Sequence, residues 1–300
     1  MIWFFIALLG YLLLAVVFVL DKFILTKSIG NPAVYTFYST IFMLAALVAY
    51  PFGVELLQGV DWLWAIVSGV TFGFALWSMF IAVKKGEASH INPFIGGFIT
   101  IFTFGFAAIF LSETLSQFQL AGMIILVFAS LLLSFEKRRG SSGIHIGYAW
   151  AILAGLLFAI SHTTAKYIYD LYPFITGFVW TRATTGLVGL LLLWHPSVRS
   201  TFKKKNTKKT NSKKHVFTIV FSNKALSVVA IILIQYAIAI GSVTLVNAMV
   251  GIQYVIMFLF ILFMTKFFPK VFKEYVTKKE LAVEWIALLF VVIGSAMFVL

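Results

Sequence analysis

The sequence contains no cysteine, few acidic residues and little charge of either sign. Among its 300 residues only 10 are aspartate or glutamate, and 11% are charged while 62% are hydrophobic. The lack of cysteine excludes disulfides, thiolate metal sites and redox chemistry through sulfur. A mean hydropathy of +1.03 lies far outside the range of a soluble globular domain. The chain is therefore expected to be an all-α integral membrane protein.

Positive charge is the exception to this scarcity, because 23 lysines and arginines give a net charge of +13. They gather in connections beside apolar runs, so lipid headgroups and membrane topology explain them better than nucleic acid does. Connections after odd-numbered runs hold most of them, including Lys84 and Lys85, while the one after the second run holds Glu55 and Asp61. The positive-inside rule then predicts both termini outside an inner or plasma membrane. Residues 199–214 are expected to form a basic, flexible loop.

Long apolar runs divide the chain into ten expected membrane helices. A membrane helix needs about 20 mostly apolar residues, because unpaired backbone groups are costly in hydrocarbon. The runs are 2–20, 33–50, 62–83, 91–111, 118–135, 147–165, 172–194, 225–241, 244–264 and 282–300. The uncharged stretch after residue 224 is too long for one crossing, so it is divided at Gly241–Ser242. The first run has the length of a signal peptide but lacks its basic flank and cleavage site, so it is taken as a helix.

A repeated motif relates the two halves of the chain. The segment G-E-A-S-H-I-N-P-F-I-G at residues 86–96 returns 155 residues later as G-S-V-T-L-V-N-A-M-V-G, so that Asn92 corresponds to Asn247. We therefore predict two five-helix halves, residues 1–140 and 141–300, in one compact domain. Five is an odd number, so the second half enters the membrane inverted, as is typical of transporters.

A second repeated block marks the starts of two helices. E-T-L-S-Q-F-Q-L-A from Glu113 matches E-Y-V-T-K-K-E-L-A from Glu274, 161 residues later. Each copy holds an S/T-x-x-E/Q capping box, in Ser116 with Gln119 and in Thr277 with Glu280. The two glutamates are therefore read as residues at loop ends, in preference to a catalytic or coupling role.

Pro93 directly follows Asn92 and is expected in the first turn of its helix, where a missing N–H does no harm. The alternative is a kink that exposes backbone carbonyls.

These motifs resemble a known transporter family. A-V-K-K-G-E-A-S-H-I-N-P from Ala82, followed by L-S-E-T-L-S-Q-F-Q-L-A-G from Leu111, resembles the signature of the EamA-type members of the drug/metabolite transporter superfamily. V-N-A-M-V-G-I-Q-Y from Val246 resembles a divergent second copy, in which Ala248 stands where the first has Pro93. The resemblance covers essentially the whole chain.

The resemblance implies a ten-helix bundle that moves small metabolites through a central cavity. The cavity would be lined by 2–20, 62–83, 91–111, 147–165, 225–241 and 244–264, with 118–135 and 282–300 peripheral. Small multidrug resistance members carry a membrane glutamate in their first helix for proton exchange. The run 2–20 has no acidic residue. Coupling to protons through a carboxylate is therefore disfavoured.

Polar residues inside the expected helices are the candidate substrate-binding residues, because polar groups in hydrocarbon are costly unless they are paired or face water. Arg182 suits a substrate carboxylate or phosphate, and equally a pairing with backbone carbonyls or a distant acid. His162 has a side chain able to titrate near neutral pH, or to pack through a hydrogen bond. Lys166 and Asp170 are expected as a solvated pair. The full candidate set is Tyr11, Trp77, Asn92, His162, Arg182, Gln235, Asn247 and Gln253.

The predicted function is secondary-active or facilitative transport, as an exporter of small metabolites such as amino acids or related organic compounds. The protein would work by alternating access as a monomer or homodimer, without a cofactor or metal. The sequence contains no P-loop, so ATP hydrolysis is not supported. A lipid-carrier flippase is the alternative. A membrane-embedded enzyme is less favoured, because the five histidines, at 90, 145, 162, 195 and 215, are scattered.

Overall fold

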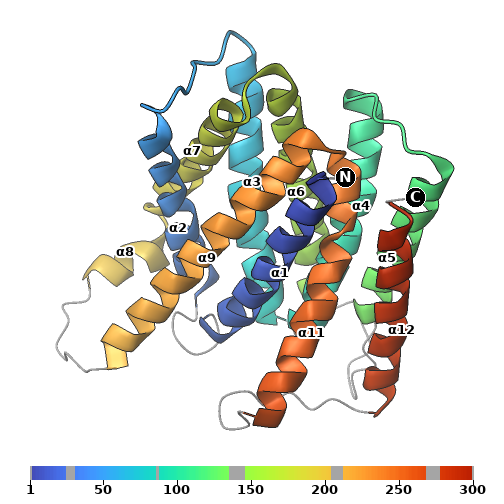
Figure 1. Cartoon of the computed structure of the whole chain (residues 1–300). Helices are drawn as coiled ribbons and strands as arrows, with labels where there is room; N and C mark the ends of the chain where they lie inside the picture. The colour runs from blue at the N-terminus through green and yellow to red at the C-terminus, as the bar shows by residue number, and fades with distance from the viewer. Residues whose placement is uncertain are drawn as a thin grey trace.

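The computed structural model describes residues 2–24, 31–85, 88–134, 146–203, 212–267 and 278–298. Every regular element in these ranges is a helix, and no strand occurs in them. The helices pack side by side in one bundle, and the N- and C-terminal ends lie near the same end of it (Figure 1). Nine helices within the described ranges are long and apolar enough to cross a membrane. The protein therefore has the fold of an all-helical, polytopic membrane protein.

Each predicted run falls on a helix. The first half comprises α1 (Ile2–Phe23), α2 (Pro32–Ile41) with its 3-10 continuation η2 (Phe42–Ala49), α3 (Asp61–Lys85), α4 (Ala88–Phe110) and α5 (Gln117–Ser134). The second comprises α6 (Ile146–Leu171), α7 (Phe174–Leu192), α8 (Pro196–Lys203), α9 (Ser212–Ile240), α10 (Val243–Ala248), α11 (Val250–Phe267) and α12 (Lys278–Ala296). The last predicted run falls on α12, whose apolar stretch Trp285–Ala296 is shorter than the nine.

Several helices extend beyond the predicted ends. The α1 helix continues three residues past residue 20, and α9 begins at Ser212, well before the predicted residue 225. An apolar run in the sequence ends at the first charged side chain, but the helix itself continues wherever the bundle provides a partner for that charge. Asp21 and Lys224 are therefore helical. The predicted flexible loop 199–214 was partly wrong, because residues 199–203 belong to α8 and 212–214 to α9; residues 204–211 lie outside the described ranges.

Two predicted helix starts are confirmed. The Gln119 N–H donates to Ser116 Oγ at 3.2 Å, and the Ser116 N–H donates to Gln119 Oε1 at 3.0 Å, so the capping box begins α5. The predicted division at Gly241–Ser242 is also present, and the Leu245 N–H donates to Ser242 Oγ at 2.9 Å. Thr277 of the second capping box, like Glu274, lies outside the described residues, and α12 begins directly after it.

The first-turn placement of Pro93 was wrong. Because α4 begins at Ala88, Pro93 lies in its second turn, inside the helix. Proline has no N–H to donate, so the carbonyl four residues earlier loses its helical hydrogen bond. The predicted run began at residue 91 because Ala88 to His90 are not strongly apolar. These three residues are nevertheless helical.

Small residues bring pairs of antiparallel helices close together. Ser68 Oγ on α3 donates to the Ser161 carbonyl on α6 at 2.9 Å, and Ser161 Oγ donates back to the Ser68 carbonyl at 2.8 Å. On another side of the bundle, α5 and α12 lie side by side (Figure 1). They meet at Gly122 and Gly294. A Cβ atom on Gly122 would lie 2.7 Å from the Gly294 carbonyl oxygen, so the two backbones are in direct contact.

Candidate functional site

A cavity of about 120 Å³ lies inside the bundle, between α1, α2, η2, α3, α4, α6, α9, α10 and α11. Its wall is mostly apolar and includes the rings of Phe18, Phe72 and Phe158. Six of the eight candidate residues line it, namely Tyr11, Asn92, His162, Gln235, Asn247 and Gln253. An apolar wall with a few polar groups is characteristic of small-molecule sites. The α5 and α12 helices contribute no lining residue among those described, as expected for peripheral helices, while α2 and η2 contribute residues that the family resemblance did not imply.

Asn247 is fixed by hydrogen bonds from two other helices. The Nδ1 atom of His162 on α6 donates to Asn247 Oδ1 at 2.8 Å, and Asn247 Nδ2 donates to Thr103 Oγ1 on α4 at 3.3 Å. All three side chains are buried. Both ends of the Asn247 amide are therefore used within the protein, and His162 is a hydrogen-bonded residue at the cavity wall.

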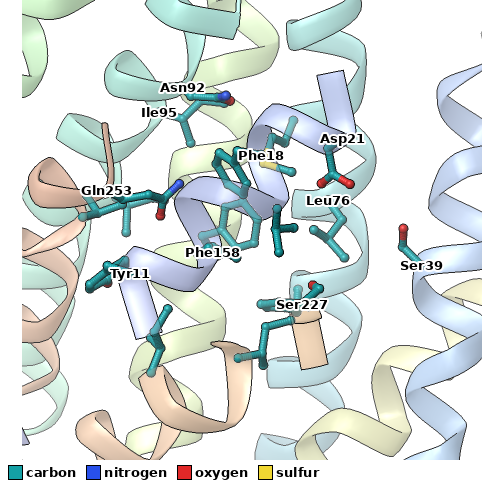
Figure 2. A pocket seen from close by; sticks show the side chains of 18 of the residues that line it. Tyr11, Phe18, Asp21, Ser39, Leu76, Asn92, Ile95, Phe158, Ser227 and Gln253 are labelled. Atoms are coloured by element: carbon teal, nitrogen blue, oxygen red, sulfur yellow. The ribbon is translucent and has the colours of Figure 1, made fainter. Parts of the chain in front are cut away.

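Asn92 and Gln253 have polar atoms without a partner. Asn92 Nδ2 lies 4.0 Å from Met257 Sδ, and Asn92 Oδ1 has no hydrogen-bond partner within the described part of the chain. Gln253 has an exposed fraction of 0%, and neither its Oε1 nor its Nε2 finds a partner there. Figure 2 shows the Gln253 side chain reaching from α11 toward Phe18 and Phe158. Buried polar groups are usually hydrogen-bonded, so these free atoms indicate a place for water or a ligand.

Each repeated motif has an irregularity in its helix shortly after the asparagine. In α4, which is one continuous helix, Pro93 follows Asn92 and leaves one carbonyl without its helical hydrogen bond. In the second copy α10 ends at Ala248 and α11 starts at Val250, although the run 244–264 was predicted as one continuous helix. Thr100 Oγ1 donates to the Asn247 carbonyl at 3.3 Å, next to this break. On two sides of the cavity, the first copy therefore lacks one helical N–H, at Pro93, and the second copy has a break in the helix, at Met249.

Trp77 and Arg182 do not line the cavity, unlike the other candidates. Trp77 packs toward α7. Its ring is stacked near Phe74 and lies edge-on to His195, with the ring centroids of Trp77 and His195 5.8 Å apart. Arg182 is fully buried, and its guanidinium carbon lies 4.2 Å from the centroid of the Phe72 ring. In the described part of the chain none of its nitrogens has a hydrogen-bond acceptor, so neither of the predicted protein partners is found for it.

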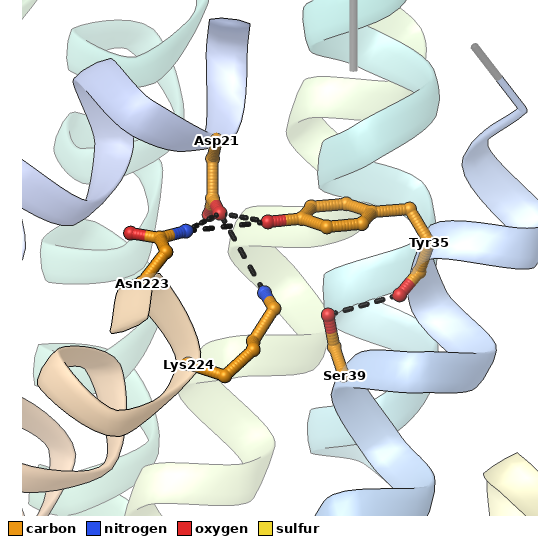
Figure 3. A network of polar contacts seen from close by, with 5 residues as sticks. All are labelled: Asp21, Tyr35, Ser39, Asn223 and Lys224. Atoms are coloured by element: carbon orange, nitrogen blue, oxygen red, sulfur yellow. Dashed lines mark hydrogen bonds and ion pairs between the residues drawn. The ribbon is translucent and has the colours of Figure 1, made fainter. Parts of the chain in front are cut away.

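A buried charged cluster at the cavity was missed by the sequence analysis (Figure 3). Asp21 on α1 accepts hydrogen bonds from the Tyr35 hydroxyl on α2 and from Asn223 Nδ2 on α9, the latter at 2.6 Å. Lys224 Nζ lies 3.5 Å from Asp21 Oδ1 and 4.1 Å from the centroid of the Tyr35 ring. Asp21 and Lys224 both line the cavity. The expectation that no carboxylate belongs to the first helix is therefore corrected.

A sequence signal for this cluster existed. Asp21 directly follows the first apolar run and is the only acidic residue before Glu55. A lone acid at the end of a span, with a lysine at the start of another, is a possible buried pair, but the partner on α9 is about two hundred residues away in the chain.

Two further polar contacts lie outside the cavity. Lys166 and Asp170 form the predicted pair, with Nζ and Oδ1 at 2.8 Å, and Lys166 also donates to the Ala239 carbonyl at 3.1 Å. Glu113, which was read as a loop-end residue, accepts a hydrogen bond of 2.6 Å from Thr244 Oγ1. This contact joins the second block of the first half to the repeated motif of the second half.

No protein-family model and no curated protein sequence matches this chain. A solved structure described only as "Crystal structure of protein" is similar to it, with a TM-score of 0.64 and 16% sequence identity, over 99% of this chain and 94% of that chain. At this identity the similarity shows a shared fold and nothing about the substrate.

Proposed function

We propose that this protein is an EamA-type secondary-active or facilitative transporter that exports small metabolites by alternating access. The observation that carries the proposal is the pair of equivalent asparagines, Asn92 and Asn247, which line one cavity from two sides. Pro93 removes one helical N–H in α4 beside the first, and the break between α10 and α11 lies two residues after the second. Transporters with inverted repeats bind their substrates where discontinuous helices free backbone groups toward the cavity.

Equivalent hydrogen bonds between the two halves of the chain support an inverted repeat. The repeat would consist of two five-helix units, 1–140 and 141–300, with α12 as the tenth span. Ser68 and Asn223 are 155 residues apart, the same separation as Asn92 and Asn247. Ser68 joins α3 to α6, and Asn223 joins α9 to α1. Equivalent residues thus bind the first helix of the opposite half, as expected for halves related by a two-fold axis in the membrane plane.

The two asparagines likewise each contact a helix of the opposite half. Asn92 on α4 reaches Met257 on α11, and Asn247 on α10 reaches Thr103 on α4. Each motif therefore contacts the helix that carries the other motif. This crossing places the asparagines of both motifs at the same cavity.

The cavity is asymmetric along the bundle, which supports a state that faces one side. Its lining residues on α3 are Phe72 and others toward the C-terminal end of that helix, which finishes at the basic Lys84 and Lys85. Toward the other end, Asp61 accepts hydrogen bonds from Tyr172 at 2.7 Å and Tyr167 at 3.4 Å, and these contacts close α3 against α6. By the positive-inside rule the cavity side is cytoplasmic.

The wall of the cavity indicates the class of substrate. The lining combines aromatic walls with the free amide of Gln253, which suits small amphipathic solutes such as amino acids or related organic compounds.

A lipid-carrier flippase is the second candidate. A separate hollow of about 310 Å³ between α3, α4 and α6 is lined by apolar side chains such as Val67, Phe106 and Ile160. An apolar hollow of this kind fits an acyl or isoprenoid chain better than it fits a polar metabolite.

A flux measurement separates the two candidates. The purified chain is reconstituted in proteoliposomes and screened with amino acids, organic acids, sugars and a fluorescent lipid-linked substrate. We expect saturable flux of a small metabolite, reduced in Gln253→Leu and retained in Trp77→Phe, whose side chain lies away from the cavity. Movement of the lipid alone would favour the flippase, and metabolite flux unaffected in Gln253→Leu would refute a role for this cavity.

A further inference from the structure

Arg182 is a buried cation without a partner in the described part of the structure. Its exposed fraction is 0%, and Nε, Nη1 and Nη2 all lack a hydrogen-bond acceptor there. An arginine keeps its charge in proteins. Leaving a buried charge uncompensated costs several kcal/mol, which is why such charges are normally paired. The guanidinium on α7 therefore needs an anion that the described protein groups do not supply.

The groups around Arg182 are already committed to other partners. His162 and Tyr169 on α6 are close enough to interact electrostatically with it. His162 donates to Asn247, however, and the Tyr169 hydroxyl donates to Gln235 Oε1 at 2.9 Å. Neither group is an anion. The protein thus surrounds the guanidinium with fixed polar neighbours and leaves the counter-charge open.

Phe72 separates Arg182 from the central cavity. Its ring lies 4.2 Å from the guanidinium carbon and also belongs to the cavity lining. It packs edge-on to Phe158, with ring centroids 5.4 Å apart. An aromatic face stabilises a cation only modestly, so it compensates a buried charge only in part.

Lys224, whose side chain is 14% exposed, is another largely buried cation in the described part of the chain, and it is paired differently. That ammonium group has a carboxylate partner in Asp21 and also lies over an aromatic ring, that of Tyr35. Arg182 lies over an aromatic ring, that of Phe72, but has no carboxylate partner among the described residues. Compared with Lys224, Arg182 therefore lacks an anionic partner.

We propose that Arg182 is the centre of an occluded anion site that takes one compact monovalent anion, either a carboxylate group or a halide, when Phe72 turns aside. The planar guanidinium offers parallel N–H groups that match a carboxylate in a bidentate arrangement. The site lies beside the transport cavity, and its occupancy is a binding equilibrium that does not depend on any flux.

The test measures thermal unfolding of the purified full-length protein by tryptophan fluorescence, at constant ionic strength. Sodium gluconate, whose anion is bulky, is the baseline and is replaced stepwise by sodium chloride or sodium formate. We expect a saturable rise in the unfolding midpoint for the wild type. Arg182→Gln should raise the apparent Kd for the anion by about tenfold or more, because it removes charge-assisted hydrogen bonds. Lys224→Gln is the matched control, since it removes a buried cation that already has a partner, and it should keep the wild-type anion response.

The outcomes are distinct. A chloride response assigns a free inorganic anion, and a response to formate alone assigns a carboxylate group; either one supports the site if Arg182→Gln raises its apparent Kd about tenfold or more. An unresponsive wild type, or an apparent Kd that is unchanged in Arg182→Gln, overturns the proposal. In gluconate, Arg182→Gln should also unfold no earlier than the wild type, because it removes an uncompensated charge; earlier unfolding would show that protein groups hold the guanidinium.

Discussion

Asn92 and Asn247 line the same cavity from corresponding positions of the repeated motif, yet only Asn247 has both ends of its amide hydrogen-bonded within the protein. Asn92 keeps a free carbonyl oxygen in the described structure. The two asparagines are therefore expected to differ in role, with Asn92 available to a substrate and Asn247 holding α6 and α4 against α10.

Replacing each asparagine with alanine should separate these roles. Asn247→Ala leaves His162 and Thr103 without partners and should destabilise the protein by about 1 to 3 kcal/mol. Asn92→Ala should change stability little and weaken substrate binding. Thermal unfolding and the concentration dependence of flux measure the two effects. Equal losses of stability in both variants would contradict this assignment.

The Asp21–Lys224 pair should behave as a buried ion pair. Asp21→Asn leaves Lys224 without its counter-charge and should cost about 3 to 5 kcal/mol, whereas Asp21→Asn with Lys224→Gln removes both charges and should recover most of that loss. Thermal unfolding of the two single variants and the double variant provides the measurement. Losses that simply add would show that the two side chains act independently.

The hydrogen bond between Glu113 and Thr244 should stabilise the folded protein more than a contact in an exposed loop usually does. Glu113 Oε1 is buried and has no hydrogen-bond partner among the described residues, and Thr244 is the donor to Oε2. Thr244→Val therefore leaves the carboxylate with no side-chain donor and should destabilise the protein by about 1 to 3 kcal/mol. Thr244→Ser keeps the hydroxyl and serves as the control. If valine and serine are tolerated equally, the hydrogen bond does not stabilise the fold.

Tyr172, in the connection between α6 and α7, gives an expected pH dependence. Its hydrogen bond to the Asp61 carboxylate raises the pKa of the phenol above its ordinary value of about 10. The bond therefore stabilises the folded protein at pH values below about 10, and this contribution is lost as the pH rises through the folded pKa. Above pH 10 the unfolding midpoint of the wild type should fall more steeply than that of Tyr172→Phe. Parallel pH curves for the two proteins would argue against the contact.

Hydropathy and capping patterns predicted most of the helices, but not α8 or the break between α10 and α11. Ten apolar runs fall on helices, and Ser116 with Gln119 forms the predicted cap. These features depend on neighbours close in the sequence, which is why they can be read without a structure. The motif that carries Asn92 and Asn247 likewise identified two residues that line the cavity.

Contacts between distant segments were not predictable in the same way. Asp21 and Lys224 were excluded from the spans because a hydropathy scan treats a charge as an end, whereas the pair neutralises itself inside the bundle. Trp77 was assigned to the site because its helix is apolar on all sides, so its sequence does not say which face meets the cavity. The break at Met249 contains no proline or glycine, and only the packing around it explains its place.

The glycine contact between α5 and α12 has a mechanical consequence. Where two backbones touch at Gly122 and Gly294, no flexible side chain can yield between them, so sliding one helix past the other would drive carbonyl against carbonyl. The α5–α12 pair is therefore expected to stay rigid. Any movement of the helices around the cavity would take place relative to this rigid pair at the edge of the molecule.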